Sequence, residues 1–323
     1  MKNIISEVCP ELFCIEIPLP DKFLKYLNSY VIRSSDRSLI IDTGFNTRDA
    51  YDAMMRGLDH IGVSPARSDI FITHSHADHF GMVSKLKEKG SRVYFNGPEI
   101  PFLENWQGLK SLVVRALDNG FPSMDIQKAG AAFPELEFDL SWLADVHVLS
   151  QGSIMAYVPY RFSCIETPGH SPGHICLYDA KQKVLISGDH VLMGISPNIQ
   201  CMDTHDNPLA DYLDSLEKVR RLEVDIVLPA HRRRFTDLDA RVGELIAHHE
   251  LRLNELRHMM NGRPLTAYEA ARQMDWDIRA DTWDDFPAAQ KWFAMGEALS
   301  HMRYLEARGE VHRMVDGDLT RYG

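Results

Sequence analysis

Six consecutive residues hold most of the chemistry that this 323-residue sequence offers. The run HSHADH, residues 74–79, contains four side chains that bind metal ions in proteins. A short apolar stretch, DIFIT, precedes the run and predicts a strand that leads into it. At an extended strand end, residues i and i+2 point to the same side, so His74 and His76 can converge on one ion. Asp78 and His79 come after the chain turns and can serve a second ion.

Three more ligand-type side chains follow predicted strands elsewhere in the chain. The segments CIETPGH, VLISGDH and DIVLPAH place His170, Asp189 and His231 directly after apolar runs. Strand ends in a layered β structure gather along one edge, so we expect all four loops to meet there. Imidazole nitrogens and carboxylate oxygens suit Zn²⁺, with Mn²⁺ or Fe²⁺ as alternatives. None of the five cysteines falls at these positions, which argues against a thiolate-rich structural zinc site.

Alternating strands and helices must position these residues. Strands are expected over 12–19, 29–35 and 38–44, followed by a helix over 47–62 whose apolar residues recur at helical spacing. A further helix is expected to follow the HSHADH run and to end at Gly90. This alternation predicts a layered α/β fold.

The second half of the chain adds two features to this fold. Residues 98–147 are mostly helical in pattern and predict an insertion. After about residue 240 the pattern is helix, helix, helix and then two short β-like runs around Asp316-Gly317, an order typical of a winged helix. We therefore expect a catalytic domain over 1–240 and a C-terminal helical, winged-helix-like domain over 241–323.

Composition and charge narrow the class of protein further. Hydrophobic residues make up 45% of the chain, so it can bury a large core and wholesale disorder is excluded. The 35 Lys and Arg residues against 46 Asp and Glu leave a net charge of −11, which repels polyphosphates, and nucleic acid is not the expected partner. The cysteines are scattered, and no apolar run approaches the roughly 18 residues of a membrane span. We expect a soluble cytoplasmic protein with reduced thiols and no membrane association.

The motifs together resemble those of a known superfamily. HSHADH, TPGH, SGDH and LPAH occur in this order, with IIDTG upstream of them. This set resembles the metallo-β-lactamase superfamily, and within it the glyoxalase II and lactonase-like hydrolases. The resemblance covers residues 10–240 and implies a four-layer αββα sandwich with the metal ions at one edge, between two sheets. The C-terminal pattern is similar to the winged helix of a glyoxalase II-like subgroup that includes RNA-cleaving relatives.

The resemblance also implies two divalent metal ions as cofactors and a role for each ligand residue. Asp42, in IIDTG, is implied to be structural and to fix the loops beneath the site by hydrogen bonds. His174, the second histidine of TPGHSPGH, is expected behind the ligands, and His190 is expected to point away from the metals. The implied ligands are His74, His76 and His170 for the first ion, Asp78, His79 and His231 for the second ion, and Asp189 as a bridge between the two.

Two such ions favour hydrolysis by an activated water. They lower the pKa of a bridging water toward about 7 and polarise a carbonyl or phosphoryl oxygen. Asp78 is the expected catalytic residue, because it can orient the hydroxide and carry a proton to the leaving group. Such a mechanism needs no serine or cysteine nucleophile.

His76 stands where redox relatives of the superfamily carry Glu, so the resemblance implies hydrolysis rather than redox chemistry. With all seven ligands present, an ester-type carbonyl, most of all a thioester, is the expected target. A lactone or a phosphodiester such as RNA stays open as an alternative substrate, and a non-catalytic binding module is the weakest alternative.

Arg232 and Arg233 are candidates to contact an anionic part of a small-molecule substrate, with a solvated surface turn as the other interpretation. Phe102 and Trp106 are candidates for an apolar pocket wall, with packing of the insertion as the other interpretation. A homodimer also stays open.

Overall fold

The strand-forming segments of the first half of the chain build a seven-stranded sheet. The computed structural model describes residues 5–20, 23–104, 109–132, 138–201, 207–276 and 280–323. Strands β1 to β4 pair with their sequence neighbours in antiparallel fashion, whereas β4 to β7 run parallel to one another. In spatial order the strands are β1 (Ile5–Cys9), β2 (Leu12–Pro18), β3 (Tyr26–Ile32), β4 (Ser38–Ile41), β5 (Ser68–Phe71), β6 (Val93–Asn96) and β7 (Val146–Leu149).

A second sheet of five strands forms from the later part of the chain. Strands β8 to β11 are antiparallel neighbours, and β12 joins β11 in parallel. A parallel pair needs a crossover connection, which α7 (Pro208–Arg220) provides. In spatial order the strands are β12 (Ile226–Pro229), β11 (Val184–Gly188), β10 (Ile175–Asp179), β9 (Tyr160–Glu166) and β8 (Ile154–Tyr157).

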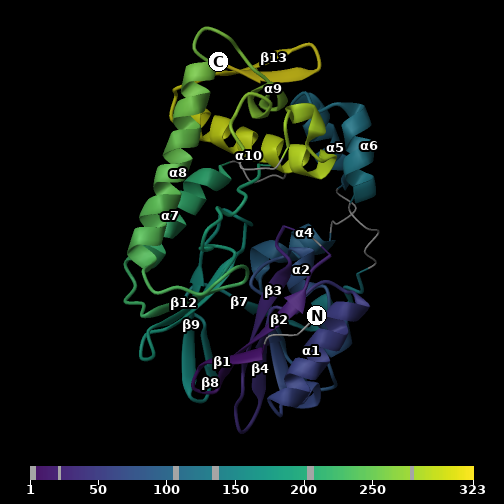
Figure 1. The fold of residues 1–323 in the computed structure, drawn as a ribbon, viewed down its shortest axis with the longest axis vertical. Helices are drawn as coiled ribbons and strands as arrows, with labels where there is room; N and C mark the ends of the chain where they lie inside the picture. Colours follow the sequence, from purple (N-terminus) through teal and green to yellow (C-terminus); the bar gives the residue numbers. More distant parts are fainter. Residues whose placement is uncertain (1–4, 21–22, 105–108, 133–137, 202–206, 277–279) are drawn as a thin grey trace. The chain divides into compact units, whose positions relative to one another are not determined.

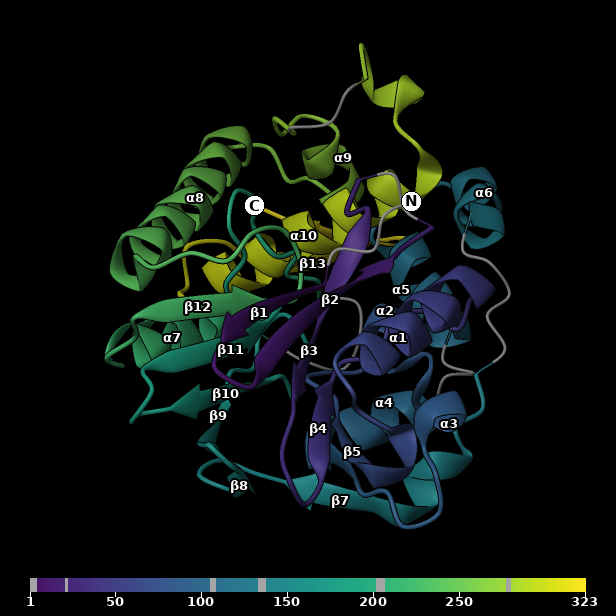
Figure 2. The same cartoon turned by 60° about the horizontal axis from the view of Figure 1, so that its bottom comes forward.

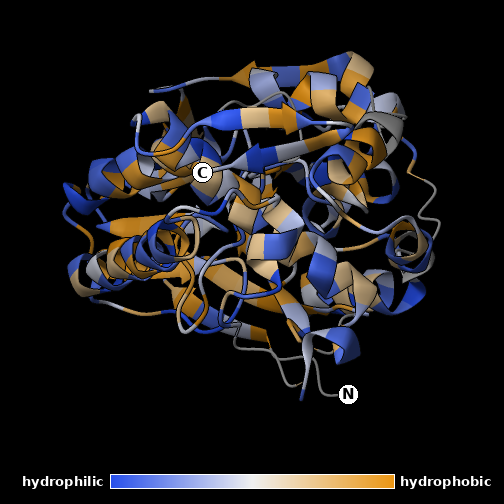
Figure 3. Ribbon diagram, turned by 90° about the horizontal axis from the view of Figure 1, so that it is seen from above, coloured by the Kyte–Doolittle hydropathy of each residue, from blue (hydrophilic) through white to orange (hydrophobic). Residues whose placement is uncertain are grey.

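The two sheets pack face to face because successive residues of their strands point to opposite faces. Ile41 and Phe71 of the first sheet share one buried hydrophobic cluster with Phe162 and Leu177 of the second sheet. The other face of the first sheet packs against α1 (Arg48–His60) and other helices (Figure 2). Figure 3 shows hydrophobic residues, in orange, along much of the strands. The four-layer αββα fold expected from the resemblance is confirmed.

Short helical elements connect the strands of the first sheet. The helix expected to end at Gly90 is wrong in its length, because α3 (Val83–Leu86) stops when Lys87 turns into extended backbone. Val83 and Leu86 are buried, whereas the residues that follow them offer no apolar side chain to the core. The other helical elements here are η1 (Pro65–Arg67), α2 (Ala77–Phe80), η2 (Gly97–Glu99), α4 (Ile100–Glu104) and η4 (Ser141–Asp145).

Contacts divide the chain into two compact units (Figure 1). The first unit, here called the sandwich unit, comprises Met1–Asn105, Glu137–Pro197 and Ser215–Val242. The second, here called the helical unit, comprises Trp106–Leu136, Asn198–Asp214 and Gly243–Gly323. Part of the predicted insertion therefore groups with residues after 240.

The helical unit is built around α10 (Ala288–Ala307), which contacts α6 (Ser123–Ala132) and α9 (Ala267–Ala271). Phe121, which precedes α6, meets the rings of Tyr268 and Trp292 edge to face at centroid distances of 5.4 and 5.5 Å. The hairpin expected around Asp316-Gly317 is present. The remaining elements are α5 (Leu109–Asp118), most of α8 (Leu238–Met259), η5 (Trp283–Asp285), β13 (Arg313–Asp316) and β14 (Leu319–Tyr322). Within the described part of the chain, none of the helices combines the length and the apolar character needed to cross a membrane.

Candidate metal centre

All seven predicted ligands lie at one edge of the sandwich unit, at the carboxyl ends of strands. In the first sheet, β5 leads into the HSHADH loop, directly beside the end of the parallel strand β4. In the second sheet, β9, β11 and β12 run in the same direction, because two antiparallel steps separate β9 from β11. The residues that follow these three strands include His170, Asp189 and His231. The topology thus brings four loops to one place.

Three imidazoles form a first group, here called the three-histidine cluster: His74, His76 and His170. The Nε2 atom of His74 lies 2.9 Å from Nδ1 of His76, and Nε2 of His170 lies 3.0 Å from the same Nδ1. All three rings meet edge to face or nearly so. Three ring nitrogens that converge in this way can share one ion.

A second group contains Asp78, His79 and His231, here called the Asp-His group. The Oδ2 atom of Asp78 lies 3.2 Å from Nε2 of His231 and 3.6 Å from Nε2 of His79. Asp189 joins the two groups, with carboxylate oxygens 3.7 Å from His79 Nε2, 3.6 Å from His170 Nε2 and 3.5 Å from His231 Nε2. This is the arrangement that a bridging carboxylate requires.

The donor atoms fit divalent metal ions. The Nε2 atom of His79 and the Oδ1 atom of Asp189 are buried and have no hydrogen-bond partner. Unsatisfied buried polar atoms are costly, so their convergence on one point indicates a cation ligand. The set consists of nitrogen and oxygen donors only, which suits Zn²⁺, Mn²⁺ or Fe²⁺.

The electrostatics of the three-histidine cluster agree with this fit. Burial first, and then the neighbouring His170, lower the pKa of His76 to about 3. Burial also holds the pKa of His74 well below its usual value, with His79 as the next cause. Both imidazoles are therefore neutral at pH 7, which is the form that binds a metal.

The acidic residues of the site are ionised. Burial raises the pKa of Asp78, but His79 and His231 lower it by more, so that it falls to about 2. Burial acts in the same way on Asp189, and His231 and His79 hold its pKa well below the usual value. Two buried carboxylates a short distance apart call for positive charge between them.

Asp42 contacts His79 of the Asp-His group and the neighbouring Thr73, in the structural role that the resemblance implies for it. Its carboxylate accepts hydrogen bonds from the Thr73 backbone N–H (2.9 Å) and the Thr73 hydroxyl (2.9 Å), and lies 2.8 Å from Nδ1 of His79. Asp42 has a φ of 57°, in the left-handed region. A hydrogen-bond partner on the second ring nitrogen fixes the tautomer and orientation of a ligand histidine.

His174 and His190 lie behind the ligands, as expected. His174 accepts a hydrogen bond from the Asp189 backbone N–H at 3.1 Å, and its other nitrogen lies 2.7 Å from the Thr167 hydroxyl. His190 is fully buried, and its ring centroid lies 6.1 Å from that of His174. The ring of His174 thus holds the loop that carries Asp189.

The predicted substrate contacts lie in different surroundings. The Arg232 guanidinium lies over the ring of Phe23 at 4.9 Å, and Arg233 is exposed. Phe102 is partly buried and packs against the hydrophobic core on the outer face of the first sheet. Trp106 lies outside the described residues. The side chain of Asp78 is 14% exposed, so solvent reaches the metal centre at this residue.

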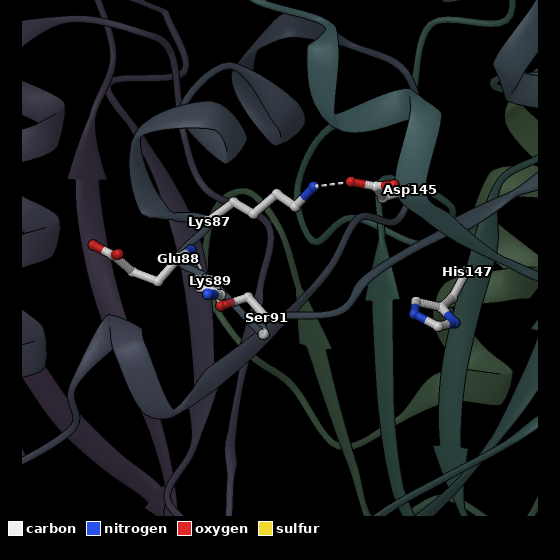
Figure 4. Close-up of a pocket in the computed structure, with 7 residues that line it drawn as sticks. Lys87, Glu88, Lys89, Ser91, Asp145 and His147 are labelled. Atoms are coloured by element: carbon white, nitrogen blue, oxygen red, sulfur yellow. Dashed lines mark hydrogen bonds and ion pairs between the residues drawn. The ribbon is translucent and has the colours of Figure 1, made fainter.

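Two other features of the chain do not belong to this centre. A surface hollow of about 490 Å³ is lined by residues that include Lys87, Asp145 and His147 (Figure 4). It lies at the amino ends of β6 and β7, whereas the metal centre lies at carboxyl ends. In the helical unit, His248, His249 and Glu297 come together. Asn198 donates a 2.7 Å hydrogen bond to Glu297.

Sequence reasoning missed two residues that contact the ligand loops. Asn96 ends β6 and Glu99 follows three residues later, at the same edge of the first sheet as the HSHADH loop. Both are buried and hydrogen-bond to the loop that follows His170. The available signal was a polar residue after a parallel strand, the same signal that located the ligands.

Comparison with known families assigns the fold. A family model described as Metallo-beta-lactamase superfamily matches residues 25–231, which include every predicted ligand. The chain belongs to the metallo-β-lactamase superfamily. A second model, described as Metallo-beta-lactamase-like, C-terminal domain, matches residues 253–323. The superfamily membership predicted from the motifs is confirmed.

Relatives within the metallo-β-lactamase superfamily are similar over much of the chain. The probable metallo-hydrolase YqjP of Bacillus subtilis (strain 168) is 24% identical over 306 residues, which cover 91% of this chain and 92% of that protein. The hydroxyacylglutathione hydrolase GloC of Haemophilus influenzae is 26% identical over 174 residues, which cover 52% of this chain and 70% of that protein. A solved metallo-beta-lactamase family protein of Thermus thermophilus superposes with a TM-score of 0.80 at 28% identity, covering 98% of this chain and 99% of that one. The chain is a metallo-β-lactamase-fold hydrolase with metal-binding His and Asp clusters.

Proposed function

We propose that this chain is a binuclear metal-dependent hydrolase of ester-type carbonyls, with a thioester as its substrate. The observation that carries the proposal is the pair of three-residue ligand groups joined by Asp189. The similarity to a hydroxyacylglutathione hydrolase supports the substrate class, because hydroxyacylglutathione is a thioester. A small molecule, rather than nucleic acid, is the proposed partner.

Each ligand group is proposed to hold one divalent ion, Zn²⁺ first, with Mn²⁺ or Fe²⁺ as alternatives. The three-histidine cluster would hold one ion and the Asp-His group would hold the other. Asp189, whose carboxylate lies 3.5–3.7 Å from histidines of both groups, would serve the two ions. Bound there, the ions supply a water of lowered pKa and a positive charge for the oxygen of the scissile carbonyl. The chain contributes the fixed positions of the donors.

Asp78 is the proposed catalytic residue. It is one of the ligands that are not fully buried, and its carboxylate lies close to both His79 and His231. With a pKa of about 2, Asp78 is ionised at pH 7 and accepts a hydrogen bond from the attacking water, which it orients.

A substrate panel tests the proposal. The Zn²⁺- or Mn²⁺-loaded chain is assayed on acyl-glutathione and acyl-coenzyme A thioesters, simple lactones, a phosphodiester and single-stranded RNA. We expect thioester turnover, and we expect Asp78→Asn to lower kcat/KM by about 100-fold or more. The matched control is Asp36→Asn, at an exposed position of the sandwich unit, which keeps wild-type turnover.

Two results would contradict the proposed substrate class. Turnover of lactones alone would identify a lactonase, and cleavage of RNA or the phosphodiester alone would identify a phosphodiesterase. Phosphodiester cleavage would make Arg232 and Arg233 the first residues to test for substrate contact, because they form a basic run directly after His231.

A further inference from the structure

Glu99 connects the two loops that carry the three-histidine cluster. It ends η2, three residues after β6, and its side chain is completely buried. The ends of β4, β5 and β6 lie side by side in the parallel part of the first sheet. Glu99 thus reaches the HSHADH loop from the neighbouring strand.

Three hydrogen bonds converge on the Glu99 carboxylate. The backbone N–H of Ser75 donates to Oε2 at 3.0 Å. The hydroxyl of Ser171 (2.6 Å) and the backbone N–H of Gly173 (2.5 Å) both donate to Oε1. One carboxylate oxygen therefore binds one ligand loop, and the other oxygen binds the second loop.

The bonded residues stand next to the cluster in sequence. Ser75 lies between His74 and His76, and Ser171 directly follows His170. A shift of Glu99 therefore displaces the backbone on which all three imidazoles are mounted. Hydrogen bonds to the groups that carry metal ligands orient those ligands and contribute to metal affinity.

The loop after His170 is fitted closely around Glu99. A Cβ atom at Gly173 would lie 2.9 Å from Cγ of Glu99, which is closer than side-chain atoms approach. Asn96 donates from Nδ2 to the Gly173 carbonyl at 2.9 Å, so the backbone C=O of Gly173 binds the last residue of β6 and its N–H binds Glu99. Only glycine permits this approach.

Residues 169–173 also match the G-x-S-x-G pattern of serine hydrolases, and the structure gives Ser171 a different role. Its side chain is buried, and its hydroxyl donates to the carboxylate of Glu99. A nucleophilic serine needs a base that accepts its proton and an exposed position at a strand-to-helix turn. Ser171 instead serves the contact with Glu99.

We propose that Glu99 is a positioning residue that prearranges His74, His76 and His170 for their metal ion. The inference rests on the proposed function only in that these histidines hold an ion. Glu99 touches neither metal nor substrate, and it acts through the backbone of the two loops.

The test is the metal affinity of Glu99→Gln, measured by Zn²⁺ titration of metal-stripped protein against a chelator. Glutamine keeps the size of glutamate but has one acceptor oxygen, so its amide N–H₂ must face an N–H of Ser75 or Gly173. We expect one of the two ions to bind about 10- to 100-fold more weakly, as is typical when an outer partner of a ligand is lost. The matched control is Glu104→Gln, an exposed glutamate five residues away, whose affinity stays that of wild type.

Further measurements separate positioning from plain structural support. If the role of Glu99 is only structural, metal-free Glu99→Gln should have a lower melting temperature than metal-free wild type, but the variant should still bind both ions as tightly as wild type does. That result overturns the proposal. If Glu99 positions the ligands, Co²⁺-loaded Glu99→Gln should show altered absorption bands, and one of its two sites should bind metal more weakly than in wild type. Should Glu99→Gln fail to fold, Ser171→Ala removes one hydrogen bond and leaves Glu99 in place. An unchanged affinity in that variant overturns the proposal, and a weakened site supports it.

The readout also separates this inference from the proposed reaction. If wild-type protein binds two ions but cleaves no thioester, the substrate class is wrong and Glu99 is still tested by affinity. If wild-type protein binds no divalent ion, the proposed metal centre itself is wrong and the role of Glu99 falls with it.

Discussion

His249, in the middle of α8, shows how a single buried histidine sets a pH limit on stability. Its ring is fully buried in the helical unit, and Nδ1 lies 3.0 Å from Nε2 of His301. The groups that face it also include His248, Arg252 and the ring of Tyr212. Burial first, and then the charges of His301 and His248, hold the pKa of His249 well below the usual value of about 6.5.

The sign of the effect follows from linkage. The unfolded chain takes up the proton near pH 6.5, whereas the folded chain does not, so the stability due to neutral His249 is complete above pH 6.5 and declines as the pH falls below it. Between pH 7.5 and 5.5 this one group accounts for a loss of about 1.4 kcal/mol.

We therefore predict that His249→Asn reduces the pH dependence of unfolding. Asparagine keeps a polar group near the Nδ1 position but does not titrate. The free energy of unfolding from urea titrations at pH 7.5 and 5.5 should fall by about 1.4 kcal/mol less in the variant than in wild type. The control is His258→Asn, an exposed histidine on the same helix, which should retain the wild-type difference. Equal losses in wild type and His249→Asn would refute the buried neutral state.

At the scale of elements, α2 must lie close to the loop after β4 so that Asp78 and His79 reach the metal centre. Gly81, directly after α2, provides this closeness. A Cβ atom there would lie 2.8 Å from the Gly44 carbonyl oxygen and 2.9 Å from the Asn46 backbone nitrogen. Backbone atoms on both sides leave no flexible side chain to move aside.

We predict that Gly81→Ala destabilises the protein by about 1–3 kcal/mol, the usual cost of one extra methyl group in a packed region. The control is Gly243→Ala in α8, where an added Cβ meets nothing within 4 Å. That substitution should stabilise the helix by about 0.5–1 kcal/mol, since alanine loses less backbone entropy than glycine. Chemical unfolding of both variants measures the difference, and equal stabilities would show that α2 is free to shift.

The elements also show what the sequence allows one to predict. Apolar runs followed by His or Asp located the four loops of the metal centre, because the carboxyl ends of strands meet at one edge in this topology. The length of α3 was wrong because Lys87, Glu88 and Lys89 have good helix propensity but nothing to bury. Glu99 was missed because its role depends on hydrogen bonds to residues 24 to 74 positions away in sequence.

At the scale of the whole molecule, the helical unit is assembled from three separate stretches of chain. Asp125, in α6, lies 3.6 Å from the ammonium group of Lys291 in α10. Thr266 begins α9 with a capping box, and its hydroxyl would lie 2.7 Å from a Cβ atom at Gly120. Residues 109–132 therefore depend on residues after 260 for their packing.

We predict that a chain truncated after residue 242 does not fold independently, although it contains every ligand of the metal centre. Without α9 and α10, the buried Phe121 loses its partners Tyr268 and Trp292 and becomes exposed. The fragment should aggregate or bind the dye ANS, whereas the full chain should not. A monomeric fragment with a cooperative unfolding transition would contradict this prediction and would establish a boundary near residue 240.

The same three-part assembly has a consequence during synthesis. On the ribosome, residues 109–132 emerge about 150 residues before α10, the main partner of α6, and before β14, which α5 contacts. At about 5–20 residues per second, this interval lasts roughly 8 to 30 s, while strands β1 to β4 can already pair with their immediate neighbours. During that time, Ala116, Phe121 and Ala129, which the finished protein buries, are exposed. The yield of correctly folded chain should therefore depend on translation speed and on chaperones that bind nascent apolar segments.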